Sequence, residues 1–329
     1  MRALLGRGLR AAVLLLGVSF ITFLLLARTP GDFASSLQLN PQISPATVAA
    51  LRAEFALDAP LLPRYVHWLG ALLRGHLGYS VTYRIPVEDL IWRRAANTLL
   101  LTSTALLIAW SLAIAIGVTA AAARRSAWDR IVGITAAALL ALPDLLIALA
   151  LLTFAAHSGL LPTGGMTTIG IEGGTWAAVR DLAAHMAIPV TVLALSTTPV
   201  LLQYVRSALE ESMPPPLAIS LNARGLPRTR VVVRHAFRLA SAPLAALGGV
   251  SVGSLLSAGL LVEVLVGWPG LGSLLLEAVT TRDQYVVIAA TVLATAALVA
   301  GNALADVLLH AVDPRVRAGA DAPAPAAVS

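Results

Sequence analysis

The amino-acid sequence predicts an all-α protein that crosses a membrane six times. Of its 329 residues, 58% are hydrophobic and only 12% are charged. A soluble domain usually carries about 25% charged residues, so this composition is typical of a membrane protein. Six apolar runs have about the 20 residues that a bilayer-crossing helix needs, and turns rich in Arg, Pro and Gly separate them.

The first apolar run, "AAVLLLGVSFITFLLLA" at residues 11–27, follows Arg2, Arg7 and Arg10. The run is longer than the apolar core of a usual secretory signal peptide. The residues after it, "RTPGDF", lack the small-x-small pattern of a cleavage site. We therefore interpret residues 1–27 as a short cytoplasmic N-terminus and an uncleaved membrane helix.

Residues 28–97 are expected to form an external segment of short amphipathic helices. Ser44 and Pro45 are typical of the first two positions of a helix. Gly75 can end a further helix, and Pro86 begins one that leads into the second span. The residues of the middle helix recur at helical spacing: Leu62, Val66, Leu69 and Leu73.

The remaining spans form a predicted membrane core over residues 98–312. The tail, 313–329, contains the low-complexity stretch "AGADAPAPAAVS" and is expected to be largely disordered. No internal repeat of the kind found in many secondary transporters is apparent. The five spans of the core are expected near residues 98–123, 131–156, 186–205, 240–266 and 285–309.

The arginine distribution predicts the orientation of these spans. The short loops of one side, between spans three and four and between spans five and six, contain only Arg180 and Arg282. The positive-inside rule therefore predicts that both termini are cytoplasmic. The other side has 14 of the 23 arginines, in four segments: the N-terminus, residues 124–130, the 206–239 loop and the tail.

The composition also excludes several kinds of chemistry. All 23 basic residues are arginine, so the chain lacks the lysine of a Walker A phosphate loop and of a Schiff base. It has no cysteine, which excludes disulfides and thiolate sites. Its six histidines are scattered without ligand spacing. We therefore expect no metal site, no cofactor and no ATP hydrolysis by this chain.

The most informative segment reads "NARGLPRTRVVVRHAFR", at residues 222–238. An arginine at the bilayer centre costs about 2.5–3.5 kcal/mol, so this segment cannot be a span. "PPP" at 214–216 should break the preceding helix. Gly225 fits the position after a short helix, and Pro227 should stop that helix.

A second helix is predicted to run from about Arg228 into the fifth span. Arg230, Arg234 and Arg238 fall on it at i, i+4 and i+8, which makes one basic stripe. Topology and anionic lipid headgroups could explain the stripe alone. They do not explain the turn at Gly225 and Pro227, which predicts a compact protrusion suited to docking a partner.

The same segment, "LNARGLPRTRVVVRHAF", resembles the cytoplasmic loop of ATP-binding-cassette importer permeases of the dipeptide/oligopeptide/nickel class. The resemblance covers nearly the whole chain, through "FLLLARTPGD", "LDAPLLPRYVHWLGALLRGHLGYS", "VEVLVGWPGLG", "RDQY" and "VDPRVR" in that order. At four places the sequence differs from the residues usual in that family, and these differences bear on substrate identity and coupling contacts more than on the fold. They are Ile219-Ser220-Leu221, His76, Leu239 and Pro143-Asp144.

The resemblance implies the fold of a type I importer permease in a bacterial inner membrane. It implies a transport subunit, not an enzyme, that imports peptides by alternating access. Nickel chelates or another small solute remain an alternative. The implied partners are two ATPase subunits, a second, related permease, an extracytoplasmic solute-binding protein and membrane lipid, with no nucleic acid. The implied coupling segment to the ATPase is Ser220, Leu221, Asn222, Ala223, Arg224, Gly225 and Leu226.

Three carboxylates in or near the spans are candidates for the transport pathway or a gate. Asp144 could cap a helix broken by Pro143, or line the path and bind a substrate amine. Asp306 and Asn302 form an i, i+4 pair on one helix face near the inner end, and we expect hydrogen bonding to another helix there more than contact with substrate. Glu263 ends the fifth span and could act as a gate or a structural residue at the outer mouth.

Two different classes of function compete with a permease. A membrane-embedded enzyme would need a nucleophile and base, or a metal motif, on facing spans, and the sequence contains no such arrangement. A stand-alone secondary transporter would not need a docking segment. The sequence therefore favours the permease.

Overall fold

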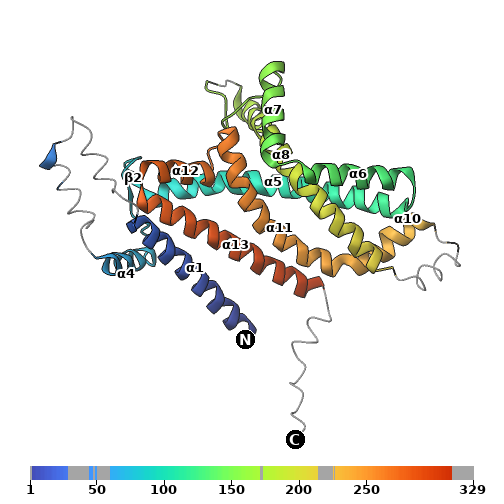
Figure 1. Ribbon diagram of the computed structural model, residues 1–329, viewed down its shortest axis with the longest axis horizontal. Coiled ribbons are helices and arrows are strands. Elements are labelled where there is room, and N and C mark those ends of the chain that lie inside the picture. Colours follow the sequence, from blue (N-terminus) through green and yellow to red (C-terminus); the bar gives the residue numbers. More distant parts are fainter. Residues whose placement is uncertain are drawn as a thin grey trace, which may run out of the picture. The chain divides into compact units, whose positions relative to one another are not determined.

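The computed structural model describes residues 2–28, 44–46, 49, 60–170, 173–213, 225 and 227–312. The chain forms two compact units. Unit 1 comprises Met1–Leu100 with Gly267–Val299, and unit 2 comprises Leu101–Val266 with Ala300–Ser329. The described residues are mainly helical, with one two-stranded hairpin (Figure 1), which confirms the predicted all-α class.

Unit 1 contains the first membrane helix and the segment that follows it. α5 and α13 begin in this unit and continue into unit 2. Its elements are α1 (Arg2–Arg28), α4 (Leu61–Leu72), β1 (Tyr79–Ser80), β2 (Ile85–Pro86), α12 (Leu271–Thr281) and the first parts of α5 (Val87–Ala122) and α13 (Gln284–Val312).

The expected helix after residue 60 is present as α4, and the chain turns away at Gly75 with φ +87°. α1 and α4 meet through an aromatic cluster. The ring of Tyr65 lies edge-on to Phe20 and Phe23, with centroids 5.2 and 5.6 Å apart. Edge-to-face pairs are favourable because a positive ring edge meets a negative face. This packing places the middle helix of the predicted external segment against the first span.

Unit 2 contains the arginine-rich segment, residues 222–238, and most of the helices of the predicted membrane core. On α5, Ala109, Ala113 and Ala120 are buried in the core of this unit, and at Gly117 an added Cβ would lie 2.8 Å from Val205. Besides the later parts of α5 and α13, its elements are α6 (Ala127–Ala141), α7 (Asp144–Ser158), α8 (Gly174–Glu211), α10 (Arg228–Arg230), the π-helix η1 (Val231–Ala236) and α11 (Phe237–Val266).

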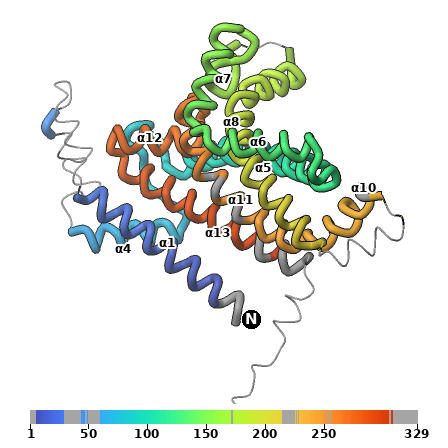
Figure 2. The backbone as a smooth tube through the Cα atoms, turned by 45° about the vertical axis from the view of Figure 1, so that its right-hand side comes forward, coloured from blue at the N-terminus to red at the C-terminus, as the bar shows by residue number. Residues whose placement is uncertain are grey.

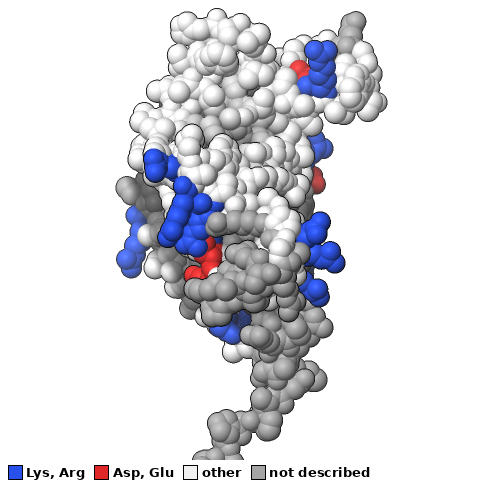
Figure 3. Space-filling model, turned by 90° about the vertical axis from the view of Figure 1, so that its right-hand side faces the viewer, with Lys and Arg blue, Asp and Glu red and all other residues white. Residues whose placement is uncertain are grey.

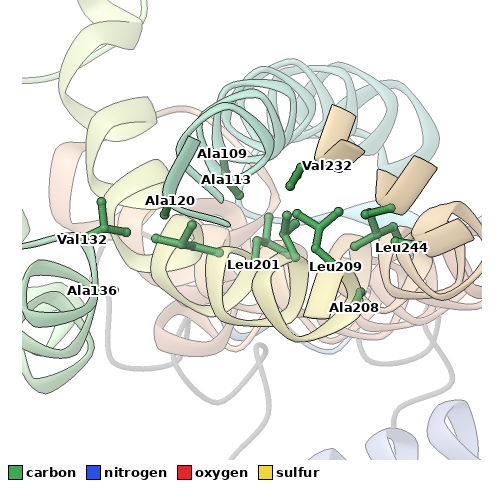
Figure 4. Packing of buried hydrophobic residues seen from close by; sticks show 14 residues of the cluster. Ala109, Ala113, Ala120, Val132, Ala136, Leu201, Ala208, Leu209, Val232 and Leu244 are labelled. Atoms are coloured by element: carbon green, nitrogen blue, oxygen red, sulfur yellow. The ribbon is translucent and has the colours of Figure 1, made fainter. Parts of the chain in front are cut away.

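The core of unit 2 lies between α5, α6, α8 and the helix that begins at Arg228. Figure 4 shows Leu201 and Leu209 of α8 between alanines of α5 and the side chains of Val232 and Leu244. Small residues at a helix interface let backbones approach closely, which strengthens van der Waals packing in a membrane. The segment that leads from Pro227 is thus joined to the core through buried side chains.

Among the described residues, five helices are long and apolar enough to cross a membrane, and the number of spans rises to as many as seven if each of two bent pairs counts as one. The predicted third span, 131–156, is one of the bent pairs: α6 and α7 meet at 95° (Figure 2). Leu142 is extended (φ −89°, ψ 123°), as expected before a proline, and Pro143 has no N–H to continue the helix. The helix broken by Pro143, one of the two alternatives drawn from the sequence, is therefore present, and it divides the predicted third span.

Candidate functional site

The helix that begins at Arg228 has two distinct faces. α10, η1 and α11 follow one another without a break from Arg228, as predicted. Between Arg228 and Ala240 its buried side chains are Val231, Val232, Ala236 and Ala240, with exposures of 2, 6, 1 and 0%. Arg230, Arg234 and Arg238 are all exposed. The basic stripe therefore lies on the outer face of a helix whose opposite face is packed into unit 2.

Gly225 and Pro227 form the turn that begins this helix. Gly225 is exposed and has φ +72°, a conformation that favours glycine, and an added Cβ would meet nothing within 4 Å. The carbonyl oxygen of Pro227 accepts hydrogen bonds from the N–H groups of Arg230 and Val231, at 2.9 and 3.2 Å. The other expected coupling residues, Ser220–Arg224 and Leu226, lie outside the described residues.

The first six residues after α10 form a π-helix, in which the Phe237 N–H donates to the Val232 carbonyl five residues earlier. Regular α-helices use the carbonyl four residues earlier, and π segments occur frequently at functional sites. The sequence reasoning did not predict this feature, and nothing in the residue pattern signals it. It lies directly between the Gly225 turn and the membrane helix α11.

A carboxylate, Asp129, fastens the neighbouring α5–α6 turn. One of its oxygens accepts from the Arg125 N–H at 3.0 Å, and the other from the Arg206 guanidinium at 2.5 Å. Ser126 caps α6 by accepting from the Asp129 N–H at 3.2 Å. Arg125 needs this support because its φ is +65°, which is strained for a residue with a side chain. Asp129 thereby joins the turn to α8.

Sequence reasoning missed this anchor. The Ser-x-x-Asp spacing from Ser126 could have signalled the helix start. The partner Arg206 could not have been identified, because it lies 77 residues away. A second ion pair, between Arg124 and Glu210 at 3.6 Å, joins the same two regions. Figure 3 shows arginine and acidic side chains gathered on this face of the molecule.

The structure places the three candidate pathway residues on different helices. Asp144 is the first residue of α7 and is half-buried; the capping position itself is occupied by Pro143, which makes no side-chain capping bond. The side chain of Glu263, in α11, is fully buried, and Glu263 has an interaction partner. Asp306 lies in α13, and its side chain is outside the described part of the chain.

The "GWPGLG" turn of unit 1 is held on α5 by three hydrogen bonds. The indole N–H of the fully buried Trp268 donates to the Asn97 carbonyl at 3.1 Å. The side-chain amide of Asn97 donates to the backbone carbonyl of Pro269 at 2.8 Å, and the backbone N–H of Leu271 donates to the Thr98 hydroxyl at 2.8 Å. Asn97 and Thr98 were not singled out in the sequence, because hydropathy treats them only as the polar start of a span.

The β1–β2 hairpin is fastened to the start of α13 by a second carboxylate. Asp283 is only 1% exposed, and its Oδ2 accepts from the Ser80 hydroxyl at 2.6 Å and the Thr82 N–H at 3.2 Å. Its Oδ1 has no hydrogen-bond partner among the described residues. Within the same residues, no group of three or more acidic or histidine side chains could hold a metal ion.

Comparisons with known proteins cover the whole of this architecture. The family described as "Binding-protein-dependent transport system inner membrane component" matches residues 113–318, and the corresponding N-terminal family matches residues 1–102.

Among individual relatives, a Brucella suis chain provisionally named as a peptide permease is 33% identical over 320 residues, which are 96% of this chain and 97% of that one. The oligopeptide transport system permease protein AppB of Bacillus subtilis is 31% identical over 315 residues, 95% of this chain and 98% of AppB. The dipeptide transport system permease protein DppB of Escherichia coli K12 is 31% identical over 323 residues, 92% of this chain and 94% of DppB. The chain therefore belongs to the family of binding-protein-dependent transport system inner membrane components.

Proposed function

We propose that this chain is the membrane permease of an ATP-driven importer of dipeptides or oligopeptides, in which the segment around Gly225 receives the movement of a separate ATPase. As a family member the chain is a multi-pass inner-membrane transport subunit, not an enzyme. The names of AppB and DppB support the choice of peptides. Nickel chelates or another small solute are the alternative cargo.

The observation that carries the coupling role is the contrast between Gly225 and the helix after it. Gly225 is exposed, and the space beside it is open. Six and seven residues later, Val231 and Val232 are buried in unit 2, where Val232 packs in the same cluster as Leu209 of α8. A rigid helix with a buried base and an accessible end can transmit a push, because packed side chains move together.

Under this proposal Ser220–Leu226 contact the ATPase, and both chain termini are cytoplasmic. ATP binding would draw two ATPases together and move α10, η1 and α11. Two permease subunits, the second one related to this chain, would then change their opening from one side of the membrane to the other. A solute-binding protein would deliver cargo on the outer side, and Asp144, Glu263 and Asp306 are candidates for the path or its gate.

The test replaces Gly225 with leucine in the reconstituted complex with its ATPases and binding protein. We expect peptide uptake to fall at least about tenfold, while ATP hydrolysis no longer responds to loaded binding protein. An added Cβ at Gly225 meets no atom of the described residues within 4 Å, so the main expected strain is that of the left-handed backbone, about 1–2 kcal/mol. Uptake of a labelled dipeptide and ATP hydrolysis are measured in proteoliposomes.

Gly159→Leu is the matched control, because Gly159 also has positive φ (+64°) and open space around its Cβ position. Gly159 ends α7, away from the proposed contact segment in the sequence. Both variants should lose the same amount of thermal stability, but only Gly225→Leu should uncouple transport. Equal uptake by the two variants would refute the coupling role.

A further inference from the structure

Among the described arginines at the arginine-rich end of unit 2, two are ion-paired and three form the stripe, while Arg125 of the α5–α6 turn and Arg130 of α6 are also exposed. Arg124 pairs with Glu210 at 3.6 Å, and Arg206 pairs with Asp129 at 2.5 Å. Arg230, Arg234 and Arg238 are exposed, and within the described residues their side chains make no ion pair or hydrogen bond. Three guanidinium groups at i, i+4 and i+8 that have no counter-charge in the described part of the chain form a surface that attracts an anionic partner.

The unpaired arginines are accompanied by exposed apolar side chains. Val233 is 57% exposed and Leu239 is 56% exposed on the same helical stretch, whose other side is buried. A helix that presents both arginines and apolar residues outward is typical of the membrane interface, where the apolar groups enter the acyl boundary and the charges meet headgroups. Long arginine side chains can also extend toward phosphates from a position slightly deeper in the interface.

The position of the stripe along the chain also favours the membrane. One of the five candidate spans, Val231–Gly253, begins one residue after Arg230. Arg234 and Arg238 therefore lie within its first two turns, since a turn contains 3.6 residues in an α-helix. The first turns of a membrane-crossing helix lie in the headgroup region of the bilayer, where phosphate groups are the expected neighbours. A protein partner would be expected to reach the Gly225 turn before it reached Arg238.

We propose that Arg230, Arg234 and Arg238 form a binding surface for the phosphate groups of anionic phospholipids. A guanidinium group suits this role because its planar fork donates two parallel hydrogen bonds to one phosphate. The bound lipids fix the depth of η1 in the interface, and thus the height at which the Gly225 turn projects. Lipid binding by the stripe does not require that the Gly225 turn contacts an ATPase.

The test measures lipid retention by the purified, delipidated transporter complex. The complex is titrated with phosphatidylglycerol and, in parallel, with phosphatidylcholine, and the lipid that remains after washing is quantified by mass spectrometry. We expect the wild type to prefer phosphatidylglycerol. The triple variant Arg230→Gln, Arg234→Gln, Arg238→Gln should bind it on the order of 100-fold more weakly, because each arginine near an anionic surface contributes roughly fivefold.

A matched triple variant removes the same charge elsewhere: Arg74→Gln, Arg93→Gln, Arg180→Gln. These three side chains are also exposed, and the control should retain phosphatidylglycerol as the wild type does. Unchanged lipid binding by the stripe variant, or an equal loss in the control, would overturn the proposal. So would a stripe variant that keeps its lipid but no longer co-purifies with the ATPase, since the stripe would then dock a protein. If the triple variant does not fold, the single variants give the same test at roughly fivefold each.

Discussion

Each unit has a turn that is held by the carboxylate of an aspartate, and the two carboxylates differ in the charge of their hydrogen-bond donors. Asp129 of unit 2 accepts from the Arg206 guanidinium and the Arg125 N–H, and its side chain is 16% exposed. Asp283 of unit 1 is 1% exposed and accepts only from neutral donors, the Ser80 hydroxyl and the Thr82 N–H, among the described residues. One anchor has a counter-charge, and the other has none within hydrogen-bond reach.

This difference predicts what each anchor depends on. A buried charge without a counter-ion loses its hydration, and Oδ1 of Asp283 has no hydrogen-bond partner among the described residues to replace that water. The acceptor geometry of Asp283 should therefore matter more than its charge. At Asp129 the charge itself should matter, because an ion pair to Arg206 is lost when the carboxylate becomes an amide. Asparagine should substitute well at one position and poorly at the other.

The largest effect is expected for Asp283→Leu. This change leaves the Ser80 hydroxyl and the Thr82 N–H without an acceptor, and each buried unsatisfied donor costs about 1–3 kcal/mol. We expect a loss of about 2–5 kcal/mol in the free energy of unfolding, measured by denaturant titration in detergent. Asp283→Asn keeps an acceptor oxygen and should stay within about 1 kcal/mol of wild type. If Asp283→Asn is as unstable as Asp283→Leu, the charge of Asp283 matters as well as its acceptor geometry, and the proposed difference from Asp129 is wrong.

A smaller effect is expected for Asp129→Asn, about 1–2 kcal/mol, because the pair with Arg206 is partly exposed and partly screened. The matched partner variant is Arg206→Gln. If the ion pair carries the effect, the double variant should lose less stability than the sum of the two single variants. The loss should also shrink as NaCl is raised, since salt screens exposed charges. Strictly additive losses would show that Asp129 acts only as a backbone acceptor.

The sequence predicted the helices well where the signal is local. The apolar run at 11–27 lies in α1, and the residues with helical spacing around Val66 lie in and beside α4. Pro86 directly precedes α5, as expected for a proline at a helix start. The turn conformation at Gly225 also agrees with prediction. In each case a few neighbouring residues determine the backbone, so periodicity and Gly or Pro placement are sufficient.

Hydropathy did not locate the break at Pro143, although the proline itself suggested a broken helix as one alternative. Hydropathy is continuous across 131–156, but it does not register the backbone N–H that a proline lacks. The anchors were missed because their partners are distant: Ser80 and Asp283 are 203 residues apart. The Asp129–Arg206 pair spans 77 residues. No local sequence pattern can identify such pairs. They stabilise the turns, whereas the positions of the helices depend on local residues.

The smallest predicted effect concerns Tyr83, in the hairpin that Asp283 holds. Its hydroxyl donates to Glu277 of α12, and burial together with the Glu277 charge raises the pKa of Tyr83 to about 12. Because the pKa is raised by folding, the neutral hydroxyl stabilises the fold fully below about pH 10, and this contribution is lost as pH rises through about 12. We expect Tyr83→Phe to lower stability by about 1 kcal/mol or less at pH 8, and the difference from wild type to vanish toward pH 12.

The midpoints of thermal unfolding of wild type and Tyr83→Phe, compared in detergent from pH 8 to pH 12, check this expectation. The Asp129→Asn variant provides the internal control, because arginine does not deprotonate in that range and its difference from wild type should stay constant. Convergence of the Tyr83 curves alone would mean that the hairpin of unit 1 is held by neutral donors and the turn of unit 2 by a fixed charge. A Tyr83 difference that is independent of pH would contradict that distinction, because the hydroxyl proton would then not be part of the contact.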